Sequence, residues 1–148
     1  MDRLDLAPSK LVAVNPVVDD DCKARIVRSM KENGWVGRDL LVEEVRQLVS
    51  PPNYAVRYFA WTGSHRIEAA IEARLTTVPC RVLSSPAAEA AFKDAGYSKA
   101  GFEHWRGAVS SKHGRKDSDR LIAVEKAGLV EVAEMLREEM GATDGCDA

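Results

Sequence analysis

The sequence has no long apolar run and few cysteines, and both shortages narrow what the protein can be. None of its apolar segments approaches the roughly 20 residues that a membrane-spanning helix needs. Cys22, Cys80 and Cys146 are too far apart for a zinc site or for the disulfide framework of a small secreted domain. The first residues, Met1 to Asp5, lack the basic-then-apolar pattern of a signal peptide. We therefore expect a cytoplasmic protein with no membrane partner.

A strong charge of either sign is also missing. The 148 residues include 21 Lys and Arg against 23 Asp and Glu, which gives a net charge of -2. This balance argues against strong unspecific DNA binding by the whole chain, although it is compatible with a local basic groove. The rest of the composition, 45% hydrophobic and 30% charged, is typical of a globular protein with one domain or one domain and an appendage.

Apolar periodicity divides the chain at Ser84 to Pro86. Residues 1–84 begin with a loosely held leader and continue with strand patterns at 10–14, 40–45, 54–61 and 78–83 and helix patterns at 21–33 and 67–75. Residues 85–148 contain helix patterns alone and end in a small acidic tail. We predict an α+β fold in which a small mixed β-sheet with helices (1–84) is followed by an α-helical C-terminal extension (85–148).

Three patterns predict where individual elements lie. The run from Tyr54 to Trp61 has large apolar groups on both faces, which indicates a strand inside the sheet. Pro79 cannot donate a backbone hydrogen bond, so it favours an entry or edge position for its strand. The apolar side between Leu121 and Leu136 indicates helix packing or a homo-oligomer contact.

The stretch from Thr62 to Arg66 carries the clearest chemical signal. A strand-like run stops at Gly63, which lets the backbone turn sharply and approach a ligand, and a helix follows at once. The first N–H groups of a helix have no intrahelical partners and lie at the positive end of its dipole, so they bind phosphates readily. Ser64, His65 and Arg66 add further donors and positive charge. The structural alternative is an ordinary helix cap followed by two solvated basic residues.

Acidic side chains stand at two places where they can serve a phosphorylated ligand. Asp20 and Asp21 begin the first helix, and Glu43 and Glu44 end a strand. A carboxylate at either place can bind Mg²⁺ or deprotonate a hydroxyl, or it can be a helix cap or a solvated strand end. We take Asp20, Asp21, Glu43 and His65 as candidate catalytic residues. No residues stand at the spacing of a dedicated metal site.

The order of elements around this stretch is distinctive. From Tyr58 to Ala70, a strand runs into a glycine, a small polar residue, a His-Arg pair and an alanine-containing helix, and a Val-Pro strand follows between Thr77 and Val82. This order resembles the ParB/sulfiredoxin superfamily. The upstream Asn-Pro pair at 15–16 and the first helix fall in the same order, so the resemblance covers about residues 8 to 84.

The resemblance implies a nucleotide-phosphate pocket. Members of the superfamily include sulfiredoxins, which use ATP, ParB partition proteins, which bind and hydrolyse CTP, free-serine kinases, and proteins described as nucleases. The cofactors it implies are therefore a nucleotide, ATP or CTP, and Mg²⁺. Carried over by position, the ligand-binding residues are those of the glycine turn together with Arg38, in the loop where the family's sheet meets its ligand: Thr62, Gly63, Ser64, His65, Arg66 and Arg38.

Two departures from the family narrow the choice. Sulfiredoxins place their reactive cysteine where Ser64 stands, and a neutral hydroxyl cannot replace a thiolate in that chemistry. Partition proteins carry a second phosphate motif after the last strand, where this chain has Ser84 to Ala87. We therefore favour a Mg²⁺-dependent phosphotransferase or nucleotide hydrolase. The alternatives are a nucleic-acid-associated module (DNA-binding or nuclease) that also uses the basic run from Lys112 to Lys116, or a non-catalytic scaffold.

Overall fold

The structure is a computed structural model that describes residues 1–13, 19–108 and 115–141. It has a five-stranded mixed sheet in the order β1-β5-β3-β4-β2. The strands are β1 (Asp2–Leu6), β2 (Leu11–Ala13), β3 (Leu40–Ser50), β4 (Asn53–Ala60) and β5 (Val78–Ser84). The helices are α1 (Asp20–Asn33), α2 (Ser64–Glu72), α3 (Ser85–Asp94), α4 (Lys99–Glu103), α5 (Arg115–Lys126) and α6 (Val130–Gly141), with a 3₁₀ turn η1 (Pro8–Lys10) and a π turn η2 (His104–Ala108). The predicted α+β class with C-terminal helices is confirmed.

The sheet combines parallel and antiparallel pairs. β4 pairs with β3 antiparallel and with β2 in parallel, so its predicted interior position is confirmed. β5 pairs with β3 in parallel and with β1 antiparallel, so it too is interior. We expected Pro79 at the entry of its strand or on an edge strand, and the edge position is wrong. Pro79 is instead the second residue of its strand, at the entry.

The N-terminal segment is the main error of the predicted fold. It was expected to be a loose leader, but residues 2–6 form the edge strand β1, in register from Asp2 opposite Val82 to Leu6 opposite Val78. Its side chains are mostly exposed and charged, so the sequence shows no apolar alternation there. Charged residues are common on edge strands, because they oppose pairing with another chain.

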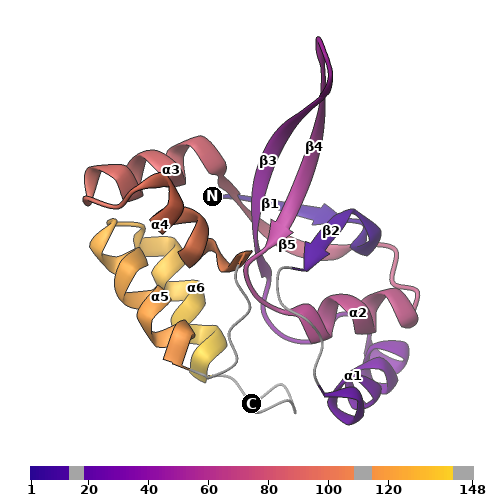
Figure 1. The fold of residues 1–148 in the computed structure, drawn as a ribbon. Coiled ribbons are helices and arrows are strands. Elements are labelled where there is room, and N and C mark those ends of the chain that lie inside the picture. The colour runs from indigo at the N-terminus through magenta and orange to yellow at the C-terminus, as the bar shows by residue number, and fades with distance from the viewer. Residues whose placement is uncertain (14–18, 109–114, 142–148) are drawn as a thin grey trace.

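A long ribbon projects from the sheet where β3 and β4 continue beyond their neighbours (Figure 1). β5 pairs with β3 only as far as Glu44, and β2 pairs with β4 only from Tyr58. Strand β3 therefore ends at Ser50, well past the predicted end at Val45. The extension carries exposed apolar side chains, with Tyr54 at 64% exposure.

The two faces of the sheet are covered by different helices (Figure 1). Side chains alternate along a strand, so Leu40 and Val42 face one side while Leu41 and Glu43 face the other. Helices α1 and α2 cover the first side, in a cluster that includes Leu40 and Val42 and also the helix residues Ile26, Met30, Ile67 and Ala70. Helices α3 to α6 cover the second side, in a cluster that joins Leu41, Trp61 and Leu83 to Phe92, Phe102, Val124, Val132 and Leu136. Much of the apolar surface that suggested an oligomer contact is therefore buried within the chain.

The cysteines differ from expectation at one position. Cys22 is disulfide-bonded, although the wide spacing of the cysteines argued against a disulfide framework. Cys80 on β5 is a free thiol, and burial raises its pKa to about 12. Across 1–13, 19–108 and 115–141, no helix is long and apolar enough to cross a membrane.

Candidate functional site

The turn between β4 and α2 is built around a glycine. Gly63 has a φ of +83°, and a Cβ added there would lie 2.3 Å from Leu40 Cδ2. A side chain at this position is therefore opposed both by the backbone conformation and by the core. The Gly63 carbonyl accepts the first helical hydrogen bond, from the Ile67 N–H at 2.9 Å. Helix α2 begins without a side-chain cap, so its first N–H groups are donors of the kind that bind anions.

The hydroxyl groups beside this glycine differ in their surroundings. Ser64 is buried, and its side chain does not cap the helix. The Thr62 Oγ1 atom is buried and has no hydrogen-bond partner among the described residues. A buried hydroxyl without a partner costs free energy, typically about 1–3 kcal/mol. Thr62 is therefore well placed to donate to a ligand or water in the turn.

Arg66 is buried and enclosed. Its side chain is 2% exposed, and its guanidinium lies over the Trp35 ring, 5.1 Å from the ring centroid. The Arg66 Nη1 atom donates to the Arg38 carbonyl at 2.7 Å, and the Trp35 Nε1 atom donates to the same carbonyl at 3.2 Å. The loop before β3 and the first turn of α2 are thus fixed to each other.

One carboxylate lies between the two arginines of the predicted phosphate site. Glu139, in the last turn of α6, accepts from Arg66 Nη2 through Oε1 and from Arg38 Nη2 through Oε2, the second at 2.9 Å. Its side chain is 18% exposed. Charge-assisted hydrogen bonds between guanidinium and carboxylate groups are among the stronger polar contacts in proteins. The arginines that sequence reasoning assigned to phosphate therefore already bind an oxyanion, supplied by the chain itself.

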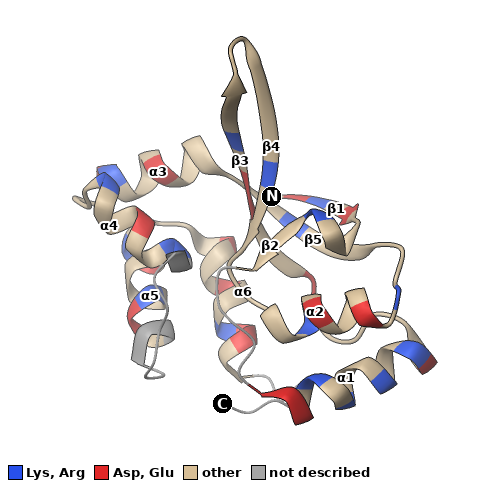
Figure 2. Ribbon diagram, turned by 45° about the vertical axis from the view of Figure 1, so that its right-hand side comes forward, with Lys and Arg blue, Asp and Glu red and all other residues tan. Residues whose placement is uncertain are grey.

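The predicted acids at α1 lie next to His65. The backbone N–H of Asp19, the N-cap of α1, donates to His65 Nε2 at 3.3 Å, so the first turns of α1 and α2 meet. Asp20 and Asp21 are exposed in the acidic first turn of α1 (Figure 2). The start of α1, which carries Asp20 and Asp21, therefore lies beside His65.

Glu43 is placed elsewhere. It is 0% exposed and faces the second cluster, where its carboxylate accepts from Trp61 Nε1 at 3.1 Å and pairs with Arg106 Nη2 at 3.1 Å. The Arg106 guanidinium also lies 5.5 Å from the centroids of both the Phe59 and Phe102 rings. A buried carboxylate needs such partners, because an unpaired one is costly. The structure does not bring Glu43 to the acids of α1.

The resemblance implies two cofactors, a nucleotide and Mg²⁺, and different residues fit each of them. No cluster of three or more His, Cys, Asp or Glu side chains that could hold a metal occurs in the described part of the chain. Mg²⁺ does not require one, because it is commonly held by one or two carboxylates together with phosphates and waters. Asp20 and Asp21 fit that pattern, while Arg38, Arg66 and the start of α2 fit the phosphates.

The residues that sequence reasoning missed are Glu139, Trp35 and Arg106. Glu139 looked like one of several surface acids on a helix, and no local signal connects it with Arg66, 73 positions away. Trp35 stands three residues before Arg38, but the arginine that lies over its ring is Arg66, so proximity in sequence would have indicated the wrong arginine. For Arg106 the sequence offered only its proximity to an aromatic residue.

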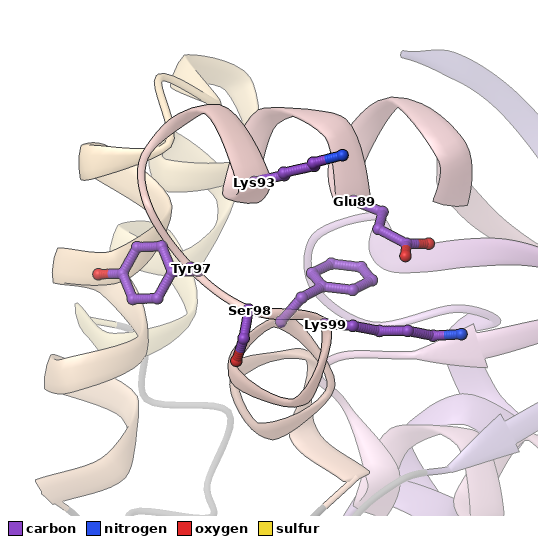
Figure 3. A pocket seen from close by; sticks show the side chains of 6 residues that line it. Glu89, Lys93, Tyr97, Ser98 and Lys99 are labelled. Atoms are coloured by element: carbon purple, nitrogen blue, oxygen red, sulfur yellow. The ribbon is translucent and has the colours of Figure 1, made fainter.

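The predicted basic run and one pocket concern other parts of the chain. Residues 112–114 of the predicted basic run lie outside the described residues. A pocket of about 290 Å³ lies between α3 and α4 (Figure 3), and it is lined by Glu89, Lys93, Tyr97, Ser98, Lys99 and Phe102. Ser98 caps α4 through the Gly101 N–H, and the Tyr97 and Phe102 rings pack on Phe92. The pocket contains none of the predicted site residues, and its lining serves the packing of helices.

Comparison with known proteins gives structural similarity alone. No family model matches the sequence, and no curated protein matches it. Sulfiredoxin from Arabidopsis thaliana aligns over 57% of this chain and 88% of its own, with 20% identity and a TM-score of 0.43. The C-terminally truncated chromosome-partitioning protein ParB from Caulobacter crescentus, complexed with CTP-gamma-S, aligns over 96% and 88%, with 19% identity and a TM-score of 0.45. Both alignments report similarity of structure at low sequence identity, and the CTP analogue belongs to the Caulobacter protein.

Proposed function

We propose that this chain binds the phosphates of a nucleotide at the start of α2, with Arg38 and Arg66 as the principal ligands. The observation that carries the proposal is the pair of guanidiniums arranged around a single carboxylate, that of Glu139. Carboxylate and phosphate are both oxyanions that accept planar guanidinium donors, so a site shaped for one can take the other.

Three neighbouring features support a phosphate rather than a carboxylate as the functional ligand. Gly63 brings the backbone close without a Cβ, the first N–H groups of α2 lack a side-chain cap, and Thr62 Oγ1 is without a described partner. A phosphate has more acceptor oxygens than a carboxylate, so it can use these donors in addition to the arginines. The ParB/sulfiredoxin-like order of the sequence is consistent with a nucleotide as the source of the phosphates.

The reaction class we propose is phosphoryl transfer or nucleotide hydrolysis. Asp20 and Asp21 lie at the start of α1 beside His65, where a carboxylate can hold Mg²⁺ or accept a proton from the attacking hydroxyl or water. Bound Mg²⁺ would neutralise charge on the phosphates. We leave Glu43 out of the proposed reaction, because its carboxylate already contacts Trp61 and Arg106.

Calorimetry with ATP, CTP, GTP and ADP, each with Mg²⁺, tests this function. Binding should weaken roughly 10- to 150-fold in Arg66→Ala, the range that corresponds to losing one hydrogen bond to a charged group. Arg3→Ala is the control, because Arg3 on strand β1 also pairs with a carboxylate, that of Asp39, at 2.9 Å. No binding by any of the four nucleotides, or equal affinity in wild type and Arg66→Ala, contradicts the proposal.

The catalytic assignment needs a separate measurement. Asp20→Asn and Asp21→Asn should lower phosphate release or transfer while leaving the calorimetric affinity for the nucleotide within a few-fold of wild type. Glu68→Gln, an exposed acid on α2 that pairs with Lys23 at 3.7 Å, is the control. If turnover exists and neither aspartate variant changes it, the base lies elsewhere.

A further inference from the structure

We infer that Glu139 is an internal competitor for the phosphate site: a phosphate that binds Arg38 and Arg66 displaces the Glu139 carboxylate and releases the last turn of α6. This inference rests on the proposed function and adds a regulation of the same site. It follows from the geometry, because each oxygen of Glu139 occupies one of the two guanidiniums. A phosphate between the same donors must take those positions.

The rest of α6 is held to the body by other contacts. Val132, Ala133 and Leu136 are buried in the second cluster. Glu131 pairs with the amino group of Met1 at 2.9 Å and with Arg81 at 3.4 Å. Displacement of Glu139 therefore leaves the first two turns of α6 docked.

The last turn depends much more on Glu139. The neighbouring side chains Arg137, Glu138 and Met140 are exposed, as is Gly141. Helix ends with few buried contacts open at low free-energy cost. Within this turn, the Glu139 side chain contacts Arg38, in the loop before β3, and Arg66, in the first turn of α2.

The position of Glu139 is also unfavourable for the helix itself. The C-terminal end of a helix dipole is negative and disfavours acidic side chains. Glu138 and Glu139 both lie in the last turn of α6, which contains no basic residue at its end. The two arginines compensate Glu139, so a ligand that takes the arginines leaves an uncompensated acid at the helix end. Release of the turn is then the expected response.

The coupling must act in both directions. By linkage, the factor by which Glu139 weakens phosphate binding equals the factor by which bound phosphate weakens the docking of the α6 end. Coupling between sites in proteins typically corresponds to about 5- to 150-fold in affinity. Removing the Glu139 charge should therefore tighten binding by a factor in that range.

The test combines calorimetry and amide hydrogen exchange on the full chain, with Mg-ATP and inorganic tripolyphosphate as probes. Glu139→Gln should bind either probe on the order of tenfold more tightly than wild type. The control Glu138→Gln, an exposed acid one position away, should bind as wild type does. In wild type, either probe should accelerate exchange at residues 137–141 and leave residues 132–136 unchanged. In Glu139→Gln, residues 137–141 should exchange fast without any probe.

The outcomes separate this inference from the proposed function. Equal affinity in wild type and Glu139→Gln, with unchanged exchange, overturns the competitor role and leaves phosphate binding standing. Absence of binding in both proteins overturns both. Binding by Glu139→Gln alone supports both, since the competitor is then strong enough to exclude the ligand. If Glu139→Gln does not fold, Glu139→Asp replaces it. That variant keeps the charge with a shorter reach, and unchanged affinity and exchange in it count against the inference.

Discussion

A Gly63→Ala variant measures the free-energy cost of placing a side chain in the turn before α2. A non-glycine residue in the left-handed region costs about 1–2 kcal/mol. The new Cβ would also lie 2.3 Å from Leu40 Cδ2, and overpacking of a core typically costs about 1–3 kcal/mol. Leu40 is 0% exposed, so its side chain has little room to move away. We therefore expect a loss of about 2–5 kcal/mol of unfolding free energy.

A second glycine separates the two contributions. Gly128, between α5 and α6, has a φ of +75° and nothing within 4 Å of an added Cβ. Gly128→Ala should therefore show the backbone cost alone. In urea unfolding followed by far-UV circular dichroism, the two midpoints should differ by roughly 0.5–1.5 M, for a slope of about 2 kcal/mol per M.

The contact with Leu40 can be checked directly by a double-mutant cycle. Leu40→Ala removes the atom that opposes the new Cβ, so Gly63→Ala should cost about 1–3 kcal/mol less in the Leu40→Ala background than in wild type. Equal losses for Gly63→Ala and Gly128→Ala, or strict additivity in the cycle, would show that the turn tolerates a side chain. The case for a close backbone approach at this site would then be lost.

Three further predictions concern residues outside the phosphate site. Glu43→Ala should lower the unfolding free energy by up to about 3–5 kcal/mol, because it removes a fully buried carboxylate and leaves Trp61 Nε1 and the partly buried Arg106 without their acceptor. Glu44→Ala, whose partner Arg46 is exposed and 3.9 Å away, should lose less than about 1 kcal/mol; similar losses in urea unfolding contradict this. Cys80 should resist iodoacetamide at pH 8.5 until the chain unfolds, because its pKa of about 12 keeps the folded thiol protonated, and labelling of the native protein within minutes contradicts it. Tyr54→Ala should shift the urea midpoint little, because Tyr54 is mostly exposed on the ribbon; a loss above about 1 kcal/mol contradicts this.

The sequence predicted the turn at Gly63 well because its signals are local. A strand pattern, a glycine and a helix pattern stand next to one another, and each determines the backbone within a few residues. The meeting of the α1 and α2 starts was less visible, because it joins residues 46 positions apart in the sequence. The interior position of β4 followed from apolar groups on both of its faces.

The errors and omissions come from contacts between distant segments. β1 is an edge strand whose side chains are largely exposed, so burial leaves no pattern in its sequence. Glu43 ends an apolar run and resembles a solvated strand end, but helices from the second half of the chain cover it. Arg66 was predicted to bind phosphate, with a solvated base as the alternative, and its enclosure by Trp35 and Glu139 was not foreseen. Which face a distant helix covers depends on tertiary packing, and single-sequence periodicity does not encode it.

The Glu43–Arg106 pair and the Arg38–Arg66–Glu139 group both join the helical half to the sheet half. The placement of acid and base in each shows why only the second can exchange with a ligand. At Glu43, the acid lies on the sheet and the arginine comes from η2. An incoming anion that attracted Arg106 would leave a fully buried carboxylate unpaired, which is strongly unfavourable. At Arg66, the arginines lie on the sheet side and the acid comes from α6 with 18% exposure. An anion there keeps both guanidiniums paired and returns Glu139 to water, so the start of α2 is where a phosphate can replace a contact of the chain at low cost.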